Sequence, residues 1–271
     1  QKKVYNWSVE TGRKRSELLS KKKSIPITLK FKSAIAKFLI YNKIKDIFGG
    51  RIRFMISGAA PISPEIIYYF KWMGITIYEA YGMTETTGVI SCNKPGFVKI
   101  GSVGQLLPET EVKIADDGEI CVRAPQNIKE YYKNEEATNE LLKPGSNGSF
   151  WLHTGDVGHI DEDGYLFITD RKKDLIITAG GKNVAPQNIE NLLKTSPYVS
   201  QAMVFGDKKP YLTALITMDE DEIAKFARDH KLLYKDLANL SKKKEVRELY
   251  RQEIHIKNEK LASYETIKKF F

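Results

Sequence analysis

A short run from Tyr81 to Glu85, Tyr-Gly-Met-Thr-Glu, carries three side chains suited to a nucleotide and a metal ion. The Tyr81 ring can stack on a flat base, and the Thr84 hydroxyl can donate to a phosphate oxygen. Glu85 offers the hard oxygen ligand that Mg²⁺ prefers. The alternative is a core tyrosine beside a polar turn, and these five residues taken alone favour it.

An acidic and a basic residue, Asp156 and Arg171, form a second candidate site. A carboxylate such as Asp156 can accept two hydrogen bonds from a sugar diol. Arg171 offers a planar fork of donors to phosphate or hydroxyl oxygens. A hairpin predicted between them can bring both to one rim, whereas the alternative is a surface salt bridge, which stabilises little. His153 is expected to pack or orient and not to react.

Two turns of small residues would let a ligand approach the backbone closely. Gly58, Ala59 and Ala60 follow a predicted strand, and Gly180-Gly181 follows another. The alternative for both is a plain tight turn without a ligand.

Four segments resemble, in order and spacing, the adenylate-forming enzyme superfamily, and most closely its long-chain acyl-CoA synthetases. The segments are Ser57–Ser63 (SGAAPIS), Tyr81–Glu85 (YGMTE), Trp151–Asp156 (WLHTGD) and Asp170–Ile176 (DRKKDLI). A weaker fifth segment combines Gly118–Arg123 (GEICVR) with Glu130–Asn134 (EYYKN). The stretch from residue 148 to residue 173 resembles the signature that separates fatty-acyl ligases from other adenylating enzymes. It does not set the acyl chain length.

The resemblance implies a role at the AMP moiety for each candidate residue. Gly58, Ala59 and Ala60 would flank adenine, and Tyr81 would contact it. Gly82 would leave room for the substrate carboxylate, Thr84 would bind the α-phosphate, and Glu85 would hold Mg²⁺. Asp156 would bind the ribose, and Arg171 would bind ribose or phosphate oxygens. Thr84 and Glu85 are the implied catalytic residues.

The resemblance also implies a mobile small domain and a two-step reaction. Lys173 and Asp174 would be the hinge, because a hinge is a few residues at the end of an element. Gly180 and Gly181 would line the path of coenzyme A. The implied reaction joins a fatty acid to CoA through acyl-AMP, with ATP consumed and AMP and pyrophosphate released.

Two lysines that the family uses have no counterpart in this sequence. One belongs to a phosphate-cradling loop expected before residue 1, and the other is a catalytic lysine expected after Phe271. Lys268 and Lys269 match an earlier segment of the family. We therefore expect a carboxy-terminal portion of a longer enzyme that adenylates poorly by itself, because electrostatic stabilisation is usually the largest catalytic contribution.

Two other interpretations remain open at this level. The first is an acyl-AMP ligase or a carrier-loading adenylation domain, which would not make a free CoA thioester. The second is a non-catalytic binding or scaffold module with residues 1–50 as its contact surface, which would not bind ATP or AMP.

The predicted elements imply a mixed fold of α/β and α+β parts. Residues 1–170 are expected to form the end of a large AMP-binding domain, with a basic helical segment (1–50), a parallel α/β part (51–97) and an antiparallel, barrel-like subdomain (98–170). Residues 171–271 are expected to form a small α+β domain. Apolar positions between 27 and 48 fit one or two amphipathic helices. They are Phe31, Ile35, Phe38, Leu39, Ile44 and Ile47.

Local signals also predict individual elements. Strands are expected over 52–56 and 75–78, joined by a helix that begins at Pro64 and turns Ile66, Ile67 and Phe70 inward, with a loop over 81–85. Hairpins are expected around the turns at residues 116–118 and 161–164. In the small domain a strand is expected over 174–178, and Asp219 is expected to cap a helix together with Glu222.

The charge of the chain is concentrated near its start. Residues 1–50 contain thirteen Lys or Arg and three Asp or Glu, a net charge of +10, while the whole chain carries +9. Such a stretch can meet an anionic membrane surface, but it lacks the interleaved aromatic residues of a single-strand nucleic-acid binder. A solvated helix face is the alternative. Two isolated cysteines, Cys92 and Cys121, indicate a reducing compartment. We therefore expect an intracellular protein, cytoplasmic or peripheral to an intracellular membrane.

Overall fold

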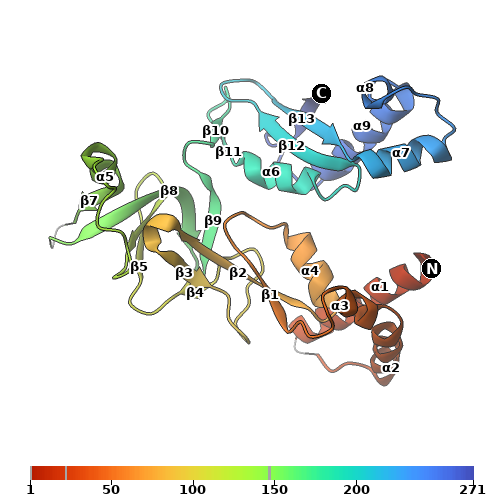
Figure 1. Cartoon of the computed structure of the whole chain (residues 1–271), viewed down its shortest axis with the longest axis horizontal. Helices are drawn as coiled ribbons and strands as arrows, with labels where there is room; N and C mark the ends of the chain where they lie inside the picture. Colours follow the sequence, from red (N-terminus) through yellow and green to blue (C-terminus); the bar gives the residue numbers. More distant parts are fainter. Residues whose placement is uncertain (1, 22, 146–147) are drawn as a thin grey trace. The chain divides into compact units, whose positions relative to one another are not determined.

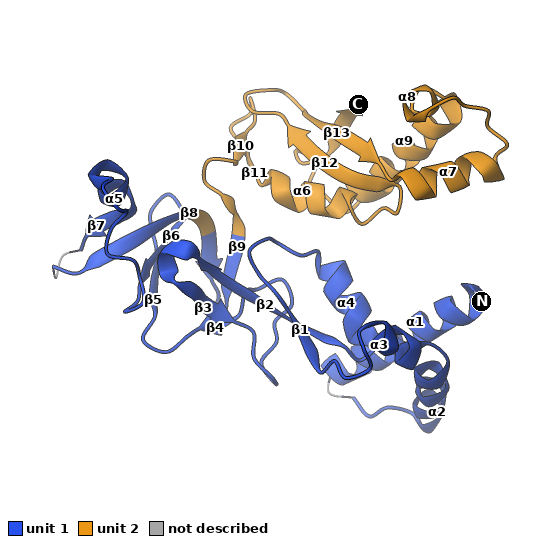
Figure 2. Ribbon diagram, viewed as in Figure 1, with its two compact units in different colours: residues 1–154, 158–168 blue, residues 155–157, 169–271 orange. Residues whose placement is uncertain are grey.

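The computed structural model describes residues 2–21, 23–145 and 148–271 and divides into two compact units (Figures 1 and 2). The first unit comprises Gln1–Thr154 and Gly158–Ile168, and the second comprises Gly155–Val157 and Thr169–Phe271. Within the described residues, no helix has the length and apolar character needed to cross a membrane.

The first unit begins with a group of helices. These are α1 (Lys2–Ser20), α2 (Ile27–Ala36), the π-helical η1 (Lys37–Tyr41), α3 (Asn42–Ile47) and, after the first strand, α4 (Pro64–Trp72). Tyr41 and Met73 are buried at the centre of this group, and Trp7, Ile40 and Ile44 pack around them. Helix formation between residues 27 and 48 is confirmed.

Only part of the predicted apolar face of this segment packs, since Ile44 contacts the buried residues but most of the other predicted positions are exposed. Phe31, Phe38 and Ile47 are exposed, with 75% of Phe38 accessible, whereas Ser33 and Ala36 are buried. A small residue also lies where α1 meets α4, because a Cβ on Gly12 of α1 would overlap the carbonyl oxygen of Trp72, the last residue of α4.

A four-stranded sheet follows the helices in the first unit. Its order is β1 (Phe54–Ser57), β2 (Thr76–Met83), β3 (Gly88–Cys92) and β4 (Gln105–Leu106). Strands β1 and β2 are parallel, with Ser57 opposite Glu79, which confirms the strand–helix–strand prediction. Of the α4 residues predicted to face inward, Ile67 is buried but Ile66 is exposed.

The strand β2 is longer than predicted, since Tyr81, Gly82 and Met83 belong to it and not to a loop. Antiparallel pairing with β3 extends it: Ala80 lies opposite Cys92, and Met83 lies opposite Gly88. The short helix η2 (Thr84–Thr86) then makes the turn.

A five-stranded sheet follows and contains both predicted hairpins; it belongs to the first unit except for residues 155–157 and 169–171, which are grouped with the second. Its elements are β5 (Glu111–Ile114), β6 (Glu119–Arg123), α5 (Glu135–Leu141), β7 (Leu142–Pro144), β8 (Phe150–Ile160) and β9 (Leu166–Arg171). The strand order is β5-β6-β8-β7, and β9 pairs with β8. Strands β5 and β6 are antiparallel, as predicted from the turn at residues 116–118. The core contains Ile90, Ile120, Val122 and Leu166.

The second unit is an α+β structure around a three-stranded sheet, β12-β13-β14. Its elements are β10 (Ile176–Ile177), β11 (Asn183–Val184), α6 (Pro186–Leu193), β12 (Val199–Phe205), β13 (Leu212–Met218), α7 (Glu220–Asp229), α8 (Leu237–Leu240), α9 (Lys244–Asn258) and β14 (Ile267–Phe270). The predicted cap is confirmed, because the Asp219 side chain accepts a hydrogen bond from the Glu222 amide. The strand predicted over 174–178 is confined to β10.

Candidate functional site

The turn after β2 is held by a fully buried threonine, Thr86. The Met83 amide donates to Thr86 Oγ1 at 3.0 Å, and the same hydroxyl donates to the carbonyl oxygen of Gly88 at 2.7 Å. Of the residues before Thr86, Thr84 is exposed and Tyr81 is half-buried. The local hydrogen bonds therefore fix a rigid turn that presents Thr84 to solvent.

Gly82 has a structural requirement of its own. A Cβ at this position would overlap the carbonyl oxygen of Gly88 and would lie 2.6 Å from its carbonyl carbon. The backbone of β3 thus occupies the space that a side chain at residue 82 would need. The packing of β2 against β3 requires glycine here, which is a different reason from the expected room for a substrate carboxylate. The role of Gly82 in substrate binding stays a prediction.

Glu85 is positioned by a residue that the sequence analysis did not single out. The Tyr131 hydroxyl donates to Glu85 Oε1 at 2.6 Å, and the Ile128 amide donates to the Glu85 carbonyl oxygen at 2.8 Å. The hydrogen bond to Glu85, with burial second, raises the pKa of Tyr131 to about 12. The segment Glu130–Asn134 resembles a weaker motif of the family, but nothing in its spacing pairs Tyr131 with a carboxylate 46 residues away.

The arrangement leaves Glu85 Oε2 available. Among the residues that the structure describes, no side chain or amide donates to Oε2. The described ranges also contain no cluster of three His, Cys, Asp or Glu side chains fit to hold a metal ion. One carboxylate fits Mg²⁺, which is usually bound by one or two carboxylates together with substrate phosphates and water.

The turn of small residues after β1 lies beside the same strand. A Cβ on Gly58 would lie 3.3 Å from the carbonyl oxygen of Ala80, the residue before Tyr81. Ala59 has a φ of 65°, a left-handed conformation that costs an L-residue about 1–2 kcal/mol. Residues 58–60 thus follow β1, and residues 81–85 form the end of β2 and the turn after it. Both lie toward the carboxyl ends of parallel strands, where ligands bind in open α/β sheets.

Asp156 and Arg171 come together, as the hairpin predicted. Asp156 is buried, and the Arg171 Nε lies 3.4 Å from Asp156 Oδ1. The Arg171 side chain is largely exposed, so its guanidinium remains accessible to a ligand. Both residues belong to the second unit. The convergence of this pair with Tyr81 and Glu85 on one nucleotide stays a prediction.

His153 is part of a polar contact inside the five-stranded sheet. Its Nδ1 lies 3.1 Å from Glu119 Oε2, and its ring nitrogens lie 3.6 and 3.7 Å from the buried Cys121 Sγ. Burial raises the pKa of the Cys121 thiol. The contacts fit the expectation that His153 packs and orients.

Asp170 anchors the segment that was predicted to be a hinge. Its buried carboxylate accepts hydrogen bonds from the Arg171 amide at 2.7 Å and from the Gln187 amide at 3.2 Å. Burial raises the pKa of Asp170. Since Gln187 lies in the first turn of α6, Asp170 supplies an acceptor for the start of that helix. The following residues, Lys173 and Asp174, are exposed in a turn.

A cavity in the second unit brings together the predicted hinge and part of the predicted CoA path. It has a volume of about 580 Å³, and Lys173, Asp174, Gly181 and Lys208 are among its lining residues. Gly181 has a φ of 71°, and its amide donates to the carbonyl oxygen of Thr178 at 2.8 Å. Gly180 lies in the same turn but is not among the lining residues.

Comparison with known proteins places the chain in a family. Residues 17–132 match the AMP-binding enzyme family, and residues 173–269 match the AMP-binding enzyme C-terminal domain. The long-chain-fatty-acid–CoA ligase FadD15 of Mycobacterium bovis is 44% identical over 195 residues, which cover 72% of this chain and 32% of that protein. The peroxisomal long chain acyl-CoA synthetase 7 of Arabidopsis thaliana is 39% identical, over 84% of this chain and 34% of that protein.

Solved structures agree with the sequence comparisons. The o-succinylbenzoate coenzyme A synthetase (MenE) of Bacillus subtilis, in complex with ATP and magnesium ion, is 31% identical with a TM-score of 0.59, over 81% of this chain and 42% of that chain. This chain spans about a third of the length of the curated relatives it matches. The match to the AMP-binding enzyme family precedes the match to its C-terminal domain along the chain. The chain belongs to the AMP-binding enzyme family of the adenylate-forming superfamily, among the long-chain acyl-CoA synthetases.

Proposed function

We propose that the protein containing this chain activates a long-chain fatty acid with ATP and transfers it to coenzyme A. A carboxylate oxygen of the fatty acid attacks the α-phosphorus of ATP, and pyrophosphate leaves as acyl-AMP forms. The CoA thiol then loses its proton, its sulfur attacks the acyl carbonyl carbon, and AMP leaves. The observation that carries the proposal is the Glu85 carboxylate, held by Tyr131 at the end of β2 beside the turn of residues 58–60.

Each candidate residue has a place in this proposal. Tyr81 would contact adenine, flanked by residues 58–60, and Gly82 would lie next to the substrate carboxylate. Thr84 would donate to the α-phosphate. Glu85 Oε2 would hold Mg²⁺, which neutralises phosphate charge when bound. Asp156 and Arg171 would bind the ribose and phosphate oxygens.

The second unit would serve the thioester step. The two units divide near residue 170. Residues 1–170 would therefore be the end of the large domain, and residues 171–271 would be the small domain. Lys173 and Asp174 would be the hinge, and Gly180 and Gly181 would line the path of CoA. The cavity that Lys173, Asp174 and Gly181 share supports this assignment. The partners would be fatty acid, ATP, CoA and the remainder of the same polypeptide.

Replacing Asp156 with alanine tests the nucleotide site. Two charge-assisted hydrogen bonds to a ribose would be lost, and we expect AMP affinity to fall by at least about ten-fold, which corresponds to 1.4 kcal/mol. Calorimetric titration of the chain with AMP and with a non-hydrolysable acyl-adenylate measures the change. Asp116→Ala, at an exposed hairpin turn, is the matched control. Equal affinities of wild type and Asp156→Ala would remove the assignment.

Replacing Tyr131 with phenylalanine tests the support of Glu85. Without the hydroxyl, Glu85 loses the contact that orients its carboxylate, and we expect the Mg²⁺ concentration needed for half-maximal ATP binding to rise by roughly ten-fold. Tyr132→Phe is the control, because the adjacent Tyr132 side chain is 83% exposed. An unchanged Mg²⁺ dependence in Tyr131→Phe would show that the hydrogen bond has no part in metal binding.

A peripheral membrane contact and an intracellular location belong to the same proposal. Residues 1–50 combine the +10 charge with exposed Ile27, Phe31, Phe38 and Ile47, a pairing that suits an anionic lipid surface. The two cysteines are free thiols among the described residues, which suits a reducing compartment. Sedimentation of the chain with phosphatidylserine vesicles in low and high salt tests the contact, and binding that salt does not weaken would contradict it.

A further inference from the structure

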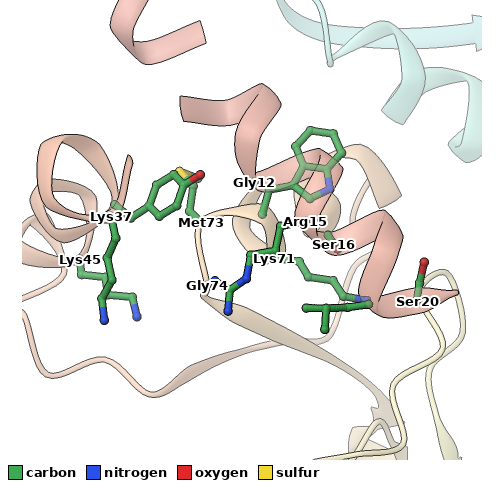
Figure 3. A pocket seen from close by; sticks show the side chains of 12 residues that line it. Gly12, Arg15, Ser16, Ser20, Lys37, Lys45, Lys71, Met73 and Gly74 are labelled. Atoms are coloured by element: carbon green, nitrogen blue, oxygen red, sulfur yellow. The ribbon is translucent and has the colours of Figure 1, made fainter. Parts of the chain in front are cut away.

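A basic cavity lies in the helical part of the first unit, and none of the residues that line it is assigned to the nucleotide (Figure 3). It has a volume of about 470 Å³. Four cationic side chains from four different elements line it: Arg15 of α1, Lys37 of η1, Lys45 of α3 and Lys71 of α4. No acidic residue is among the residues that line it.

These four cations have no carboxylate partner within the described parts of the chain. The two acidic residues of α1 are engaged elsewhere: Glu10 pairs with Arg13 at 2.7 Å, and Glu17 pairs with the same guanidinium. Four like charges around one cavity repel one another. An anion that enters the cavity would remove this repulsion and would gain charge-assisted hydrogen bonds.

The walls of the cavity are fixed by close packing. The buried Tyr41 donates its hydroxyl to the Ser8 carbonyl oxygen at 2.5 Å, which joins η1 to α1. A Cβ on Gly12 would overlap Trp72, so α1 and α4 are in backbone contact there. Gly74 also lines the cavity. Its φ is 78°, and a Cβ on it would lie 3.9 Å from Lys45 Nζ. The cations therefore extend from a rigid frame, which reduces the entropy lost on binding.

We propose that this cavity binds a phosphate ester, with the phosphate among Arg15, Lys37, Lys45 and Lys71. A guanidinium with several ammonium groups matches a dianionic phosphate. Trp72 and Leu19 add an apolar wall beside the cations, and this wall suits the organic part of an ester. The phosphate can come from a lipid headgroup or from a soluble compound, and the site differs from diffuse attraction of residues 1–50 to a membrane because it is a single cavity. The proposal does not rest on the adenylating activity.

The test compares two double variants with the same change in charge. In Lys45→Gln/Lys71→Gln the cavity loses two cations, whereas in Lys30→Gln/Lys43→Gln two exposed lysines outside it are lost. The probes are inorganic phosphate and dibutyryl phosphatidic acid, titrated calorimetrically into the chain. We expect saturable binding at one site, at least ten-fold weaker in the cavity variant and changed less than two-fold in the control. Lys45→Arg/Lys71→Arg, which keeps the charge, should retain binding.

The remaining arms identify the source of the phosphate. Equal affinity for both probes would point to soluble phosphate, whereas binding of dibutyryl phosphatidic acid alone, together with variant-sensitive binding to vesicles of 80% phosphatidylcholine and 20% phosphatidic acid, would point to a lipid headgroup. Three results would overturn the proposal. They are no saturable binding of either probe, equal weakening in both glutamine variants, and binding that Asp156→Ala abolishes but the cavity variant does not change.

Discussion

Replacing Gly82 with alanine is expected to lower the free energy of unfolding of the first unit by about 3 kcal/mol. The added Cβ would overlap the carbonyl oxygen of Gly88, and backbone atoms cannot move aside as a flexible side chain can. The pairing of β2 with β3 would have to open where the register already shifts, between Tyr81 and Gly82. The same opening would displace Thr84 and Glu85, so AMP binding should weaken together with stability.

The measurement is urea unfolding followed by tryptophan fluorescence. All three tryptophans, Trp7, Trp72 and Trp151, lie in the first unit, so their emission reports on that unit. Gly58→Ala is the matched control, because the Cβ added there would lie 3.3 Å from Ala80 and should cost less than about 1 kcal/mol. If the two variants unfold at the same urea concentration, the close approach of β3 to Gly82 is wrong.

Replacing Glu79 with glutamine is expected to stabilise the first unit at alkaline pH by on the order of 3 kcal/mol. Glu79 is only 8% exposed on β2, and burial raises its pKa to about 7, opposed by one hydrogen bond from the Gly101 amide. The folded carboxyl thus holds its proton more tightly than the unfolded one. In the wild type this stability is fully present below a pH of about 4.5 and is lost as the pH rises through about 7.

Glutamine cannot ionise, yet its carbonyl oxygen can still accept from the Gly101 amide, which lies 3.0 Å from Glu79 Oε2. The difference in unfolding free energy between variant and wild type should therefore be small at pH 4.5 and largest at pH 8. Urea titrations at both pH values measure it, with Glu140→Gln, at an exposed position of α5, as the control. A difference that does not depend on pH would contradict the buried ionisation of Glu79.

Local sequence signals predicted the elements that local interactions stabilise. The turns at residues 116–118 and 161–164 lie between strands that pair, and Asp219 caps the helix that follows it. Turn glycines and capping side chains act over a few residues, so their consequences can be derived from adjacent positions. The four motifs likewise predicted the family, because they carry the residue types that an adenylate site uses.

Predictions of which face of a helix packs against a neighbouring element were less successful. The apolar positions from Phe31 to Ile47 share helical spacing, but spacing does not determine which face meets a neighbour. In α2 the small residues Ser33 and Ala36 take the buried positions, and Phe31 and Phe38 remain exposed. The prediction that Ile66 faces inward was wrong for a related reason, since Ile67, the next residue of α4, takes the buried position.

The sequence by itself determined the family, the order of the elements and the residue types available at the site. Only the tertiary structure decided that Tyr131 holds Glu85, that the backbone of β3 fills the space beside Gly82, that Glu79 is buried, and that four cations from four helical elements line one cavity. These contacts join residues far apart in the chain. Their energies depend on distance and burial in three dimensions, which neither local propensity nor motif spacing encodes.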